Sequence, residues 1–248
     1  MITNHLTLLL LDSFWKILLP GLRVTVPLTA LAFSLALVIA VGIALIQFAH
    51  VRILSSAARC YIWIIRGTPL LVQLYVVFYG LPGAGIVIDP FPCAVLVFAV
   101  NEGAYCAETM RGALESVPYG QIEAGRCVGM TYLQIMRRIV LPQAFRTAFP
   151  PLSNELIAMV KDTSLAANIT VLEMFMATQR IVARTYEPLA LYIEVACIYL
   201  MFSTVLTQLQ HYGEKKLNRY TLREDRGVFG IKKAAGLFRR HDAGEAGK

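Results

Sequence analysis

The feature that most constrains the fold is an apolar stretch near the N-terminus. From Leu22 to Phe48 the chain carries no charged residue after Arg23. A helix of this length crosses the roughly 30 Å of hydrocarbon in a bilayer. The whole chain is 57% hydrophobic and 16% charged, with a mean hydropathy of +0.60, and is therefore more apolar than a soluble globular domain. The sequence predicts a membrane protein.

Four further apolar stretches follow this first one. They run from Cys60 to Leu81, from Phe91 to Met110, from Pro150 to Ile169 and from Pro188 to Leu209. The sequence therefore predicts an all-α, polytopic fold with five transmembrane helices, because a helix satisfies its backbone hydrogen bonds internally. The preceding residues 1–20 carry one apolar helical stripe. We expect them to lie along the membrane interface before a turn at Pro20–Gly21, or else to begin the first span.

Lysine and arginine are distributed unevenly between the connectors. Most of them follow the first, third and fifth predicted spans, whereas the connector from Pro82 to Pro90 has none. Because positive charge is retained in the cytoplasm, we expect the N-terminus outside and the C-terminus inside. The net charge of +7 then reflects topology and not a nucleic-acid-binding face. The predicted organisation is an interfacial segment (1–20), a transmembrane domain (21–218) and a basic cytoplasmic tail (219–248).

A polar and basic segment from Gly120 to Pro142 separates the third and fourth predicted spans. Glu123 to Cys127 and Met130 to Val140 both have helical composition. Gly129 between them disfavours one continuous helix by about 1 kcal/mol. The expected shape is helix, hinge, helix, ended by Pro142. On spacing alone, an ordinary cytoplasmic loop with a solvated basic face is an equally good interpretation.

The residues of this segment resemble the EAA loop of ABC importer permeases. The matching positions are Glu123, Ala124, Gly125, Gly129, Ile139, Leu141 and Pro142, with glycine in place of alanine at the third EAA position. The resemblance implies that a loop of residues 118–147 binds a cytoplasmic ABC ATPase dimer. ATP and Mg²⁺ would then belong to that partner, since the sequence contains no G-x-x-x-x-G-K-[ST] motif.

Polar residues inside the predicted spans are candidates for a transport pathway, because each is costly at bilayer depth. They are Asn101, Glu102, Tyr105 and Glu108 in the third span and Glu155, Lys161 and Asp162 in the fourth. Lys161 and Asp162 do not share a helix face, so we expect Lys161 to pair with Glu102 or Glu108. Gly103 and Ala107 form a small-xxx-small pair that lets another helix approach closely.

These charges allow two interpretations. They can pair with one another and only hold the bundle together, or some of them can line a site for a zwitterion near the middle of the membrane. A free amino acid has an ammonium group that carboxylates attract and a carboxylate that arginine attracts. The predicted spans contain both kinds of side chain.

Three more segments resemble signatures of the polar amino acid subfamily of these permeases. They are Arg66–Gln73 (RGTPLLVQ), Ala104–Ala124 and Lys161–Ala167 (KDTSLAA). The match is strongest with cystine-type permeases, whereas Glu102 is more typical of general or basic amino acid permeases. The resemblance implies a bacterial inner-membrane protein that pairs with a second permease subunit and receives substrate from an extracytoplasmic binding protein. The substrate-pathway residues are then Arg66, Thr68, Pro69, Asn101, Glu102, Tyr105, Glu108, Glu155, Lys161, Asp162, Thr163 and Ser164.

The expected function is the transmembrane subunit of an ATP-driven importer for a polar amino acid, with no covalent chemistry of its own. The alternative is an ion-coupled secondary transporter in which Glu102, Glu108 and Asp162 carry protons. An enzyme with a metal or a Ser/His site is not expected. The five cysteines form no C-x-x-C pair, and the histidines lie outside the interior of the predicted spans; these are His5, His50, His211 and His241.

Overall fold

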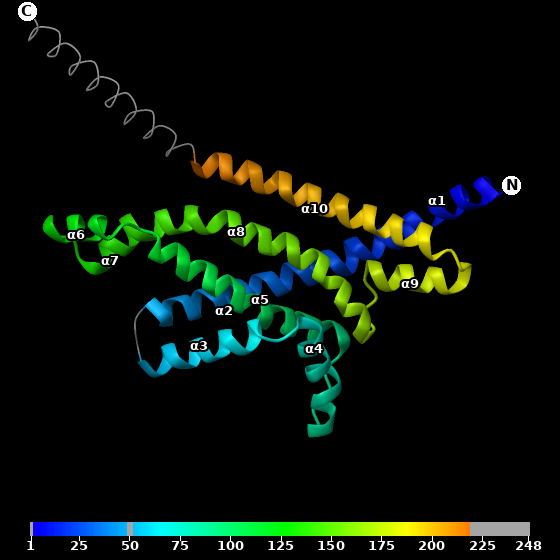
Figure 1. The fold of residues 1–248 in the computed structure, drawn as a ribbon, viewed down its shortest axis with the longest axis horizontal. Coiled ribbons are helices and arrows are strands. Elements are labelled where there is room, and N and C mark those ends of the chain that lie inside the picture. The colour runs from blue at the N-terminus through cyan, green and yellow to red at the C-terminus, as the bar shows by residue number, and fades with distance from the viewer. Residues whose placement is uncertain (1, 49–51, 219–248) are drawn as a thin grey trace, which may run out of the picture. The chain divides into compact units, whose positions relative to one another are not determined.

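The computed structural model describes residues 2–48 and 52–218 and is helical throughout its regular elements (Figure 1). The α-helices are α1 (Ile2–Pro20), α2 (Val26–Phe48), α3 (Arg52–Arg66), α4 (Leu70–Tyr75), α5 (Pro90–Glu115), α6 (Tyr119–Cys127), α7 (Tyr132–Ile135), α8 (Leu141–Asp162), α9 (Met174–Thr185) and α10 (Pro188–Asn218). Wider π turns form η1 (Gly21–Thr25), η2 (Val76–Gly80) and η4 (Met136–Val140), and tighter 3-10 turns form η3 (Leu81–Ala84) and η5 (Thr163–Ile169). The predicted all-α class is confirmed. His50 and the predicted tail lie outside the described residues.

Contacts divide the chain into a unit of residues 1–208 and a second unit that begins at Leu209. The described part of the second unit is the last turns of α10. There Gln210 Nε2 donates to Glu214 at 2.9 Å, and His211 lies 3.5 Å from the same carboxylate. All other elements belong to the first unit.

The first three elements form one unbroken helical path from Ile2 to Phe48. The turn predicted at Pro20–Gly21 is absent, since Pro20 keeps helical dihedral angles (φ −56°, ψ −35°). The apolar part, Leu6–Phe48, has 43 residues and is about 65 Å long, which is twice the hydrocarbon thickness. The interfacial location of residues 1–20 stays a prediction.

Three π turns each end two residues before a proline. η1 precedes Pro27, η2 precedes Pro82 and η4 precedes Pro142. Proline lacks an N–H group, and its ring clashes with the carbonyl four residues earlier in an α-helix. A π turn widens the helix at that carbonyl and relieves the clash. Pro142 therefore does not end the helix as predicted, and the chain continues from η4 directly into α8.

The second predicted span, Cys60–Leu81, is not a single helix. α3 and the segment Leu70–Ala84 meet at an angle of 101°, and the break is visible beside α4 in Figure 1. Among the described residues, three helices are long and apolar enough to cross a membrane, or four if this bent pair is one span. The predicted Pro150–Ile169 span is not among them. Its helical part lies in α8, which has 22 residues and is long enough, but α8 is too polar because it carries Arg146, Glu155, Lys161 and Asp162. The predicted count of five is not confirmed, and the orientation stays a prediction.

The central contact of the fold is between α2 and α5. α2 turns a row of small residues inward at a spacing of four; these are Ala32, Ala36, Ala40 and Ala44, all buried. The small residues on α5 are Gly103, Ala104 and Ala107. The two alanines pack in one cluster with Ala40 of α2. A Cβ atom at Gly103 would lie only 2.8 Å from Ile39 Cγ2. The predicted close approach at the small-xxx-small pair is therefore confirmed.

Replacing Gly103 with valine is expected to destabilise this contact. The added side chain overlaps Ile39, and overpacking of this kind costs about 1–3 kcal/mol. The measurement is the midpoint of thermal unfolding of the detergent-purified protein. Gly112→Val on the same helix is the matched control, because nothing lies within 4 Å of its added Cβ atom. Equal midpoints for the two variants would contradict the packing described here.

A buried carboxylate ties α9 to α10. Glu173 is fully buried and caps α9 by accepting hydrogen bonds from the N–H groups of Phe175 (2.8 Å) and Met176 (2.7 Å). The hydroxyl group of Tyr199 on α10 donates to the same carboxylate at 2.7 Å. The end of α1 packs beside these helices, through Ile17 and Leu18. Sequence analysis did not predict α9 or this cap.

Candidate functional site

A cavity of about 530 Å³ lies at the bend between α3 and α4. Four segments build its wall: the bend itself, α5, the end of α8 and the start of η5. The lining residues are Arg66, Gly67, Thr68, Pro69, Leu70, Asn101, Glu102, Tyr105, Glu155, Asp162 and Leu165. The volume lies within the range of small-molecule sites.

Most of the residues predicted for a substrate pathway meet at this cavity. Those that line it are Arg66, Thr68, Pro69, Asn101, Glu102, Tyr105, Glu155 and Asp162. Those that do not are Glu108, Lys161, Thr163 and Ser164. The bend in the chain is what brings the RGTP segment against α5 and α8, which are far from it in sequence. The roles of these residues in transport stay predictions.

The bend is fixed by local sequence. A Cβ atom at Gly67 would lie 2.8 Å from the carbonyl oxygen of Trp63, so the turn requires glycine. Pro69 cannot donate a backbone hydrogen bond, and it restricts Thr68 to extended backbone. Thr68 Oγ1 donates to the carbonyl of Ile64 at 2.9 Å. The helix therefore stops at Arg66 and leaves that side chain at the edge of the cavity.

Gln73 completes this turn and was missed by sequence analysis. Its Nε2 donates to the carbonyl of Ile65 (2.8 Å) and to Oγ1 (2.8 Å) and the carbonyl (3.2 Å) of Thr68. Its Oε1 accepts a hydrogen bond from Asn101 Nδ2 at 3.0 Å. The signal in the sequence was the glutamine four residues after Pro69, where a side chain can reach back over the break.

The charged side chains of the cavity are three carboxyl groups and one guanidinium. The guanidinium of Arg66 lies over the ring of Tyr105, 5.1 Å from its centre, in a cation–π contact. Glu102 is only 6% exposed. The thiol of Cys106, one turn along α5, donates to it weakly at 3.6 Å. The cavity thus offers acceptors for ammonium groups and one donor group for a carboxylate.

The predicted pairing of Lys161 with Glu102 or Glu108 is wrong. Glu108 accepts instead from Arg111 of its own helix, with Nε to Oε2 at 3.2 Å, and Arg111 also binds Glu115 at 2.6 Å. Side chains three and four apart on a helix meet without help from another segment. Lys161 is exposed and lines a separate, mainly apolar pocket of about 700 Å³ together with Ser164. Among the described residues, no His, Cys, Asp and Glu side chains form a group that could hold a metal ion.

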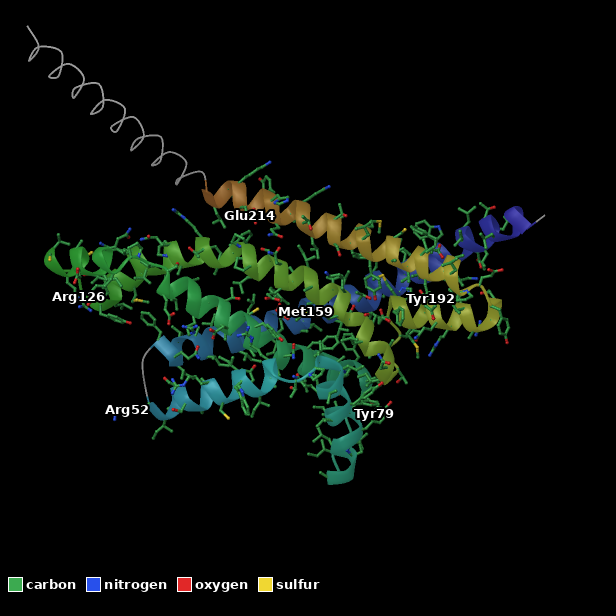
Figure 2. All side chains as sticks on the ribbon, viewed as in Figure 1. Arg52, Tyr79, Arg126, Met159, Tyr192 and Glu214 are labelled. Atoms are coloured by element: carbon green, nitrogen blue, oxygen red, sulfur yellow. The ribbon has the colours of Figure 1, made fainter. Side chains whose placement is uncertain are left out.

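The segment that resembles an EAA loop forms the predicted helix, hinge and helix. α6 ends in a Schellman motif, in which Met130 N–H donates to Gly125 O and Gly129 N–H donates to Arg126 O, both at 3.0 Å. Gly129 has φ +77°, which favours glycine. α7 then starts at a capping box between Thr131 and Gln134. In Figure 2, Arg126 marks α6.

The candidate coupling residues divide into an exposed and a packed set. Exposed are Glu123, Ala124, Gly129, Leu141 and Pro142, and the packed set is Gly125 and the half-buried Ile139. A Cβ atom at Gly125 would lie 3.0 Å from Ile135 and 3.2 Å from Ile139. Glycine at the third EAA position therefore lets α6 lie close to α7 and η4. The same segment also exposes large apolar side chains at Val128, Tyr132 and Leu133.

Comparison with known families identifies the class of this fold. Residues 36–219 match the family model described as "Binding-protein-dependent transport system inner membrane component". The chain belongs to this family and is the permease component of an ABC importer. It is a multi-pass protein of the inner membrane, its task is translocation, and ATP hydrolysis belongs to a separate ATPase.

Two relatives and one solved structure show which permeases this chain is similar to. The chain is 46% identical over 210 residues to the L-cystine transport system permease protein TcyB of Bacillus subtilis, covering 84% of this chain and 90% of that protein. It is 39% identical over 220 residues to the nopaline transport system permease protein NocM of Agrobacterium fabrum, covering 85% and 91%. Among solved structures, an amino acid ABC transporter with histidines matches with a TM-score of 0.79 and 33% identity, covering 83% of this chain and 96% of that chain.

Proposed function

We propose that this chain moves a polar amino acid across the inner membrane by alternating access, and that the cavity at the α3–α4 bend is the substrate site. The observation that carries the proposal is the convergence of Arg66, Asn101, Glu102 and Asp162, from three separate segments, on one cavity. Ionisable groups in membrane-spanning segments are costly, so their presence favours a functional role. The names of relatives support the substrate class, since they include cystine, nopaline, octopine and arginine permeases.

We propose further that the exposed surface of α6 and α7 docks in a cleft of a cytoplasmic ATPase dimer, which holds ATP and Mg²⁺. Its support is that this short segment exposes both a carboxylate, Glu123, and apolar side chains, Val128 and Leu133. Closure of the ATPase dimer would pull two such loops together and open the bundle outward. A second permease subunit, identical or related, supplies the other loop, and an extracytoplasmic binding protein delivers the substrate. Nothing in the comparisons favours the ion-coupled alternative.

The cavity assignment can be tested by protection of a thiol. The exposed native cysteines, Cys60, Cys127 and Cys197, are first replaced with serine. Leu165→Cys then places a thiol in the cavity wall. We expect a polar amino acid, tested as L-arginine, L-cystine and L-glutamine, to slow maleimide labelling of this thiol in the permease purified with its ATPase.

The matched control is Leu189→Cys, at an exposed position that does not line the cavity. Its labelling rate should be the same with and without amino acid. If every amino acid leaves the rate at Leu165→Cys unchanged, the cavity is not the substrate site.

A further inference from the structure

One face of α3 carries a row of arginines that ends at the cavity. The row consists of Arg52, Ser56, Arg59, Trp63 and Arg66 and is called the arginine stripe. Within the proposed function, we infer that the arginine stripe guides the carboxylate of the amino acid between the cavity and the cytoplasmic side of the membrane. The inference rests on the cavity being the substrate site.

The three arginines of the stripe recur at a spacing of seven residues. Seven residues are almost two full helical turns, so Arg52, Arg59 and Arg66 lie on the same side of α3. Neighbouring arginines are about 10 Å apart along the helix axis, and the whole stripe is about 21 Å long. All five side chains are exposed, and the indole of Trp63 adds an N–H donor between Arg59 and Arg66.

The rest of α3 divides into a packed face and an apolar exposed face. The packed face is buried against α2 and α5 and consists of Ser55, Ala58 and Ile62. The apolar exposed face has no charged residue and consists of Ile53, Ala57, Cys60 and Ile64. The apolar face suits lipid, whereas a guanidinium at bilayer depth is costly unless it contacts water or a partner. The arginine stripe therefore faces a water-filled space.

The outer two arginines have no carboxylate partner in the described part of the chain. Nη2 of Arg59 donates to Ser56 Oγ at 3.0 Å, which is a contact within the stripe. Among residues 2–48 and 52–218, no carboxylate forms an ion pair with Arg52 or Arg59. A surface that carries charge of one sign beside a low-dielectric wall attracts ions of the opposite sign. The stripe therefore attracts an anion.

The length of the stripe favours a carboxylate that travels along it over a lipid headgroup. A lipid phosphate stays at the surface of the roughly 30 Å of hydrocarbon and does not reach along about 21 Å of helix. Arg66 lines the cavity, and Arg52 marks the end of α3 away from the bend (Figure 2). The predicted orientation places the Arg52 end in the cytoplasm. The anion that has to leave the cavity in that direction is the α-carboxylate, which every amino acid carries.

The stripe offers the carboxylate a succession of equivalent partners. A guanidinium binds a carboxylate through two parallel hydrogen bonds. An exposed pair of this kind is worth only about 1 kcal/mol or less, so each arginine also lets the carboxylate go. The substrate can therefore exchange Arg66 for Arg59 and then for Arg52, and it does not have to leave the cavity without a counter-charge.

The test compares two adjacent positions on α3. Ser56→Cys lies in the arginine stripe and Ala57→Cys on the apolar face, in a chain whose Cys60, Cys127 and Cys197 have been replaced with serine. The permease is purified with its ATPase, reconstituted in phosphatidylcholine nanodiscs and labelled with an anionic or a cationic thiosulfonate reagent. Each rate is divided by the rate with free cysteine. We expect Ser56→Cys to favour the anionic reagent about tenfold, and Ala57→Cys to react slowly with both.

Arg59→Gln removes one charge of the stripe and should reduce this preference several-fold. Equal normalised rates of the two reagents at Ser56→Cys would overturn the inference. Slow reaction of Ser56→Cys with both reagents would show that lipid or another chain covers the stripe, and would also overturn it. If this slow reaction appears only when phosphatidylglycerol replaces part of the phosphatidylcholine, the occupant is an anionic lipid headgroup.

Uptake distinguishes failure of this inference from failure of the proposed site. Arg59→Gln should lower uptake about tenfold but leave the protection of Leu165→Cys by amino acid unchanged, because Arg59 does not line the cavity. Arg59→Lys keeps the charge and should retain most of the uptake. Arg184→Gln, at an exposed position in α9, is the matched control and should not change uptake.

Normal uptake in the Arg59→Gln variant would contradict the inference and leave the proposed site intact. Failure of the proposed site would appear as absent protection of Leu165→Cys in a chain that retains Arg59. Equal loss of uptake in Arg59→Gln and Arg59→Lys would show that Arg59 has a structural role, and would contradict a guide that depends on charge.

Discussion

Replacing Glu123 with lysine is expected to abolish transport and to release the ATPase, while the chain still inserts into the membrane. Glu123 is exposed on α6, and Val128 and Leu133 are exposed in the same segment. The end of this helix is fixed by the Schellman motif at Gly129. The substitution reverses the charge within the proposed interface but touches no packed residue. A misplaced charge in an interface costs several kcal/mol, so the affinity for the ATPase should fall by about 100-fold or more.

The measurement is the amount of ATPase that co-purifies with the tagged chain from detergent extract. Glu187→Lys, which makes the same change of charge in the connector between α9 and α10, is the control and should retain the ATPase. Normal association in the Glu123→Lys variant would show that α6 is not the coupling surface.

Replacing Glu102 or Asp162 with alanine is expected to impair uptake severely without releasing the ATPase. Both side chains line the cavity, and Glu102 is almost fully buried there. In the proposed site, removing either one would leave the ammonium group of the substrate without its carboxylate partner, at a cost of a few kcal/mol. Uptake should therefore fall by about 100-fold.

Loss of uptake is distinguished from loss of the ATPase by measuring uptake and ATPase association on the same preparations. Asp12→Ala serves as the control, because this carboxylate pairs with Lys16 on α1 and is exposed. If uptake survives in both cavity variants, the pathway runs elsewhere and the cavity has another role.

The elements that were predictable from sequence are those set by local chemistry. α5 spans Pro90–Glu115 against a prediction of Phe91–Met110, because its start at Asp89–Pro90 and its apolar composition are local signals. The hinge at Gly129 was predictable for the same reason, since a glycine between two helical segments marks a C-cap.

Two prolines were misinterpreted because a proline can be accommodated within a continuous helix. Pro20 and Pro142 were expected to stop helices, yet the chain stays helical at both. A π turn of five residues before Pro142 removes the clash between the proline ring and the preceding carbonyl. The π turn itself was not predicted from the sequence. At Pro69 the helix does break, because Gly67 allows a close turn and Gln73 supplies the missing hydrogen bonds.

The candidate cavity was predictable as a set of residues but not as a geometry. Costly polar residues at membrane depth identified Glu102, Glu155 and Asp162 without knowledge of the fold. The pairing of Lys161 with Glu108 was predicted wrongly, because Arg111, one turn along the same helix, already binds Glu108. The contribution of Gln73 also required the structure, since it depends on which way two amides face.

This chain is the translocation subunit of an ATP-driven amino acid importer. The most direct measurement is the ATPase activity of the complex that co-purifies with the tagged chain, reconstituted in lipid with candidate amino acids and the extracytoplasmic binding protein. We predict an ATPase partner whose activity is stimulated by at least one polar amino acid. A chain that purifies alone and still accumulates an amino acid on a proton gradient, without ATP, would contradict the account.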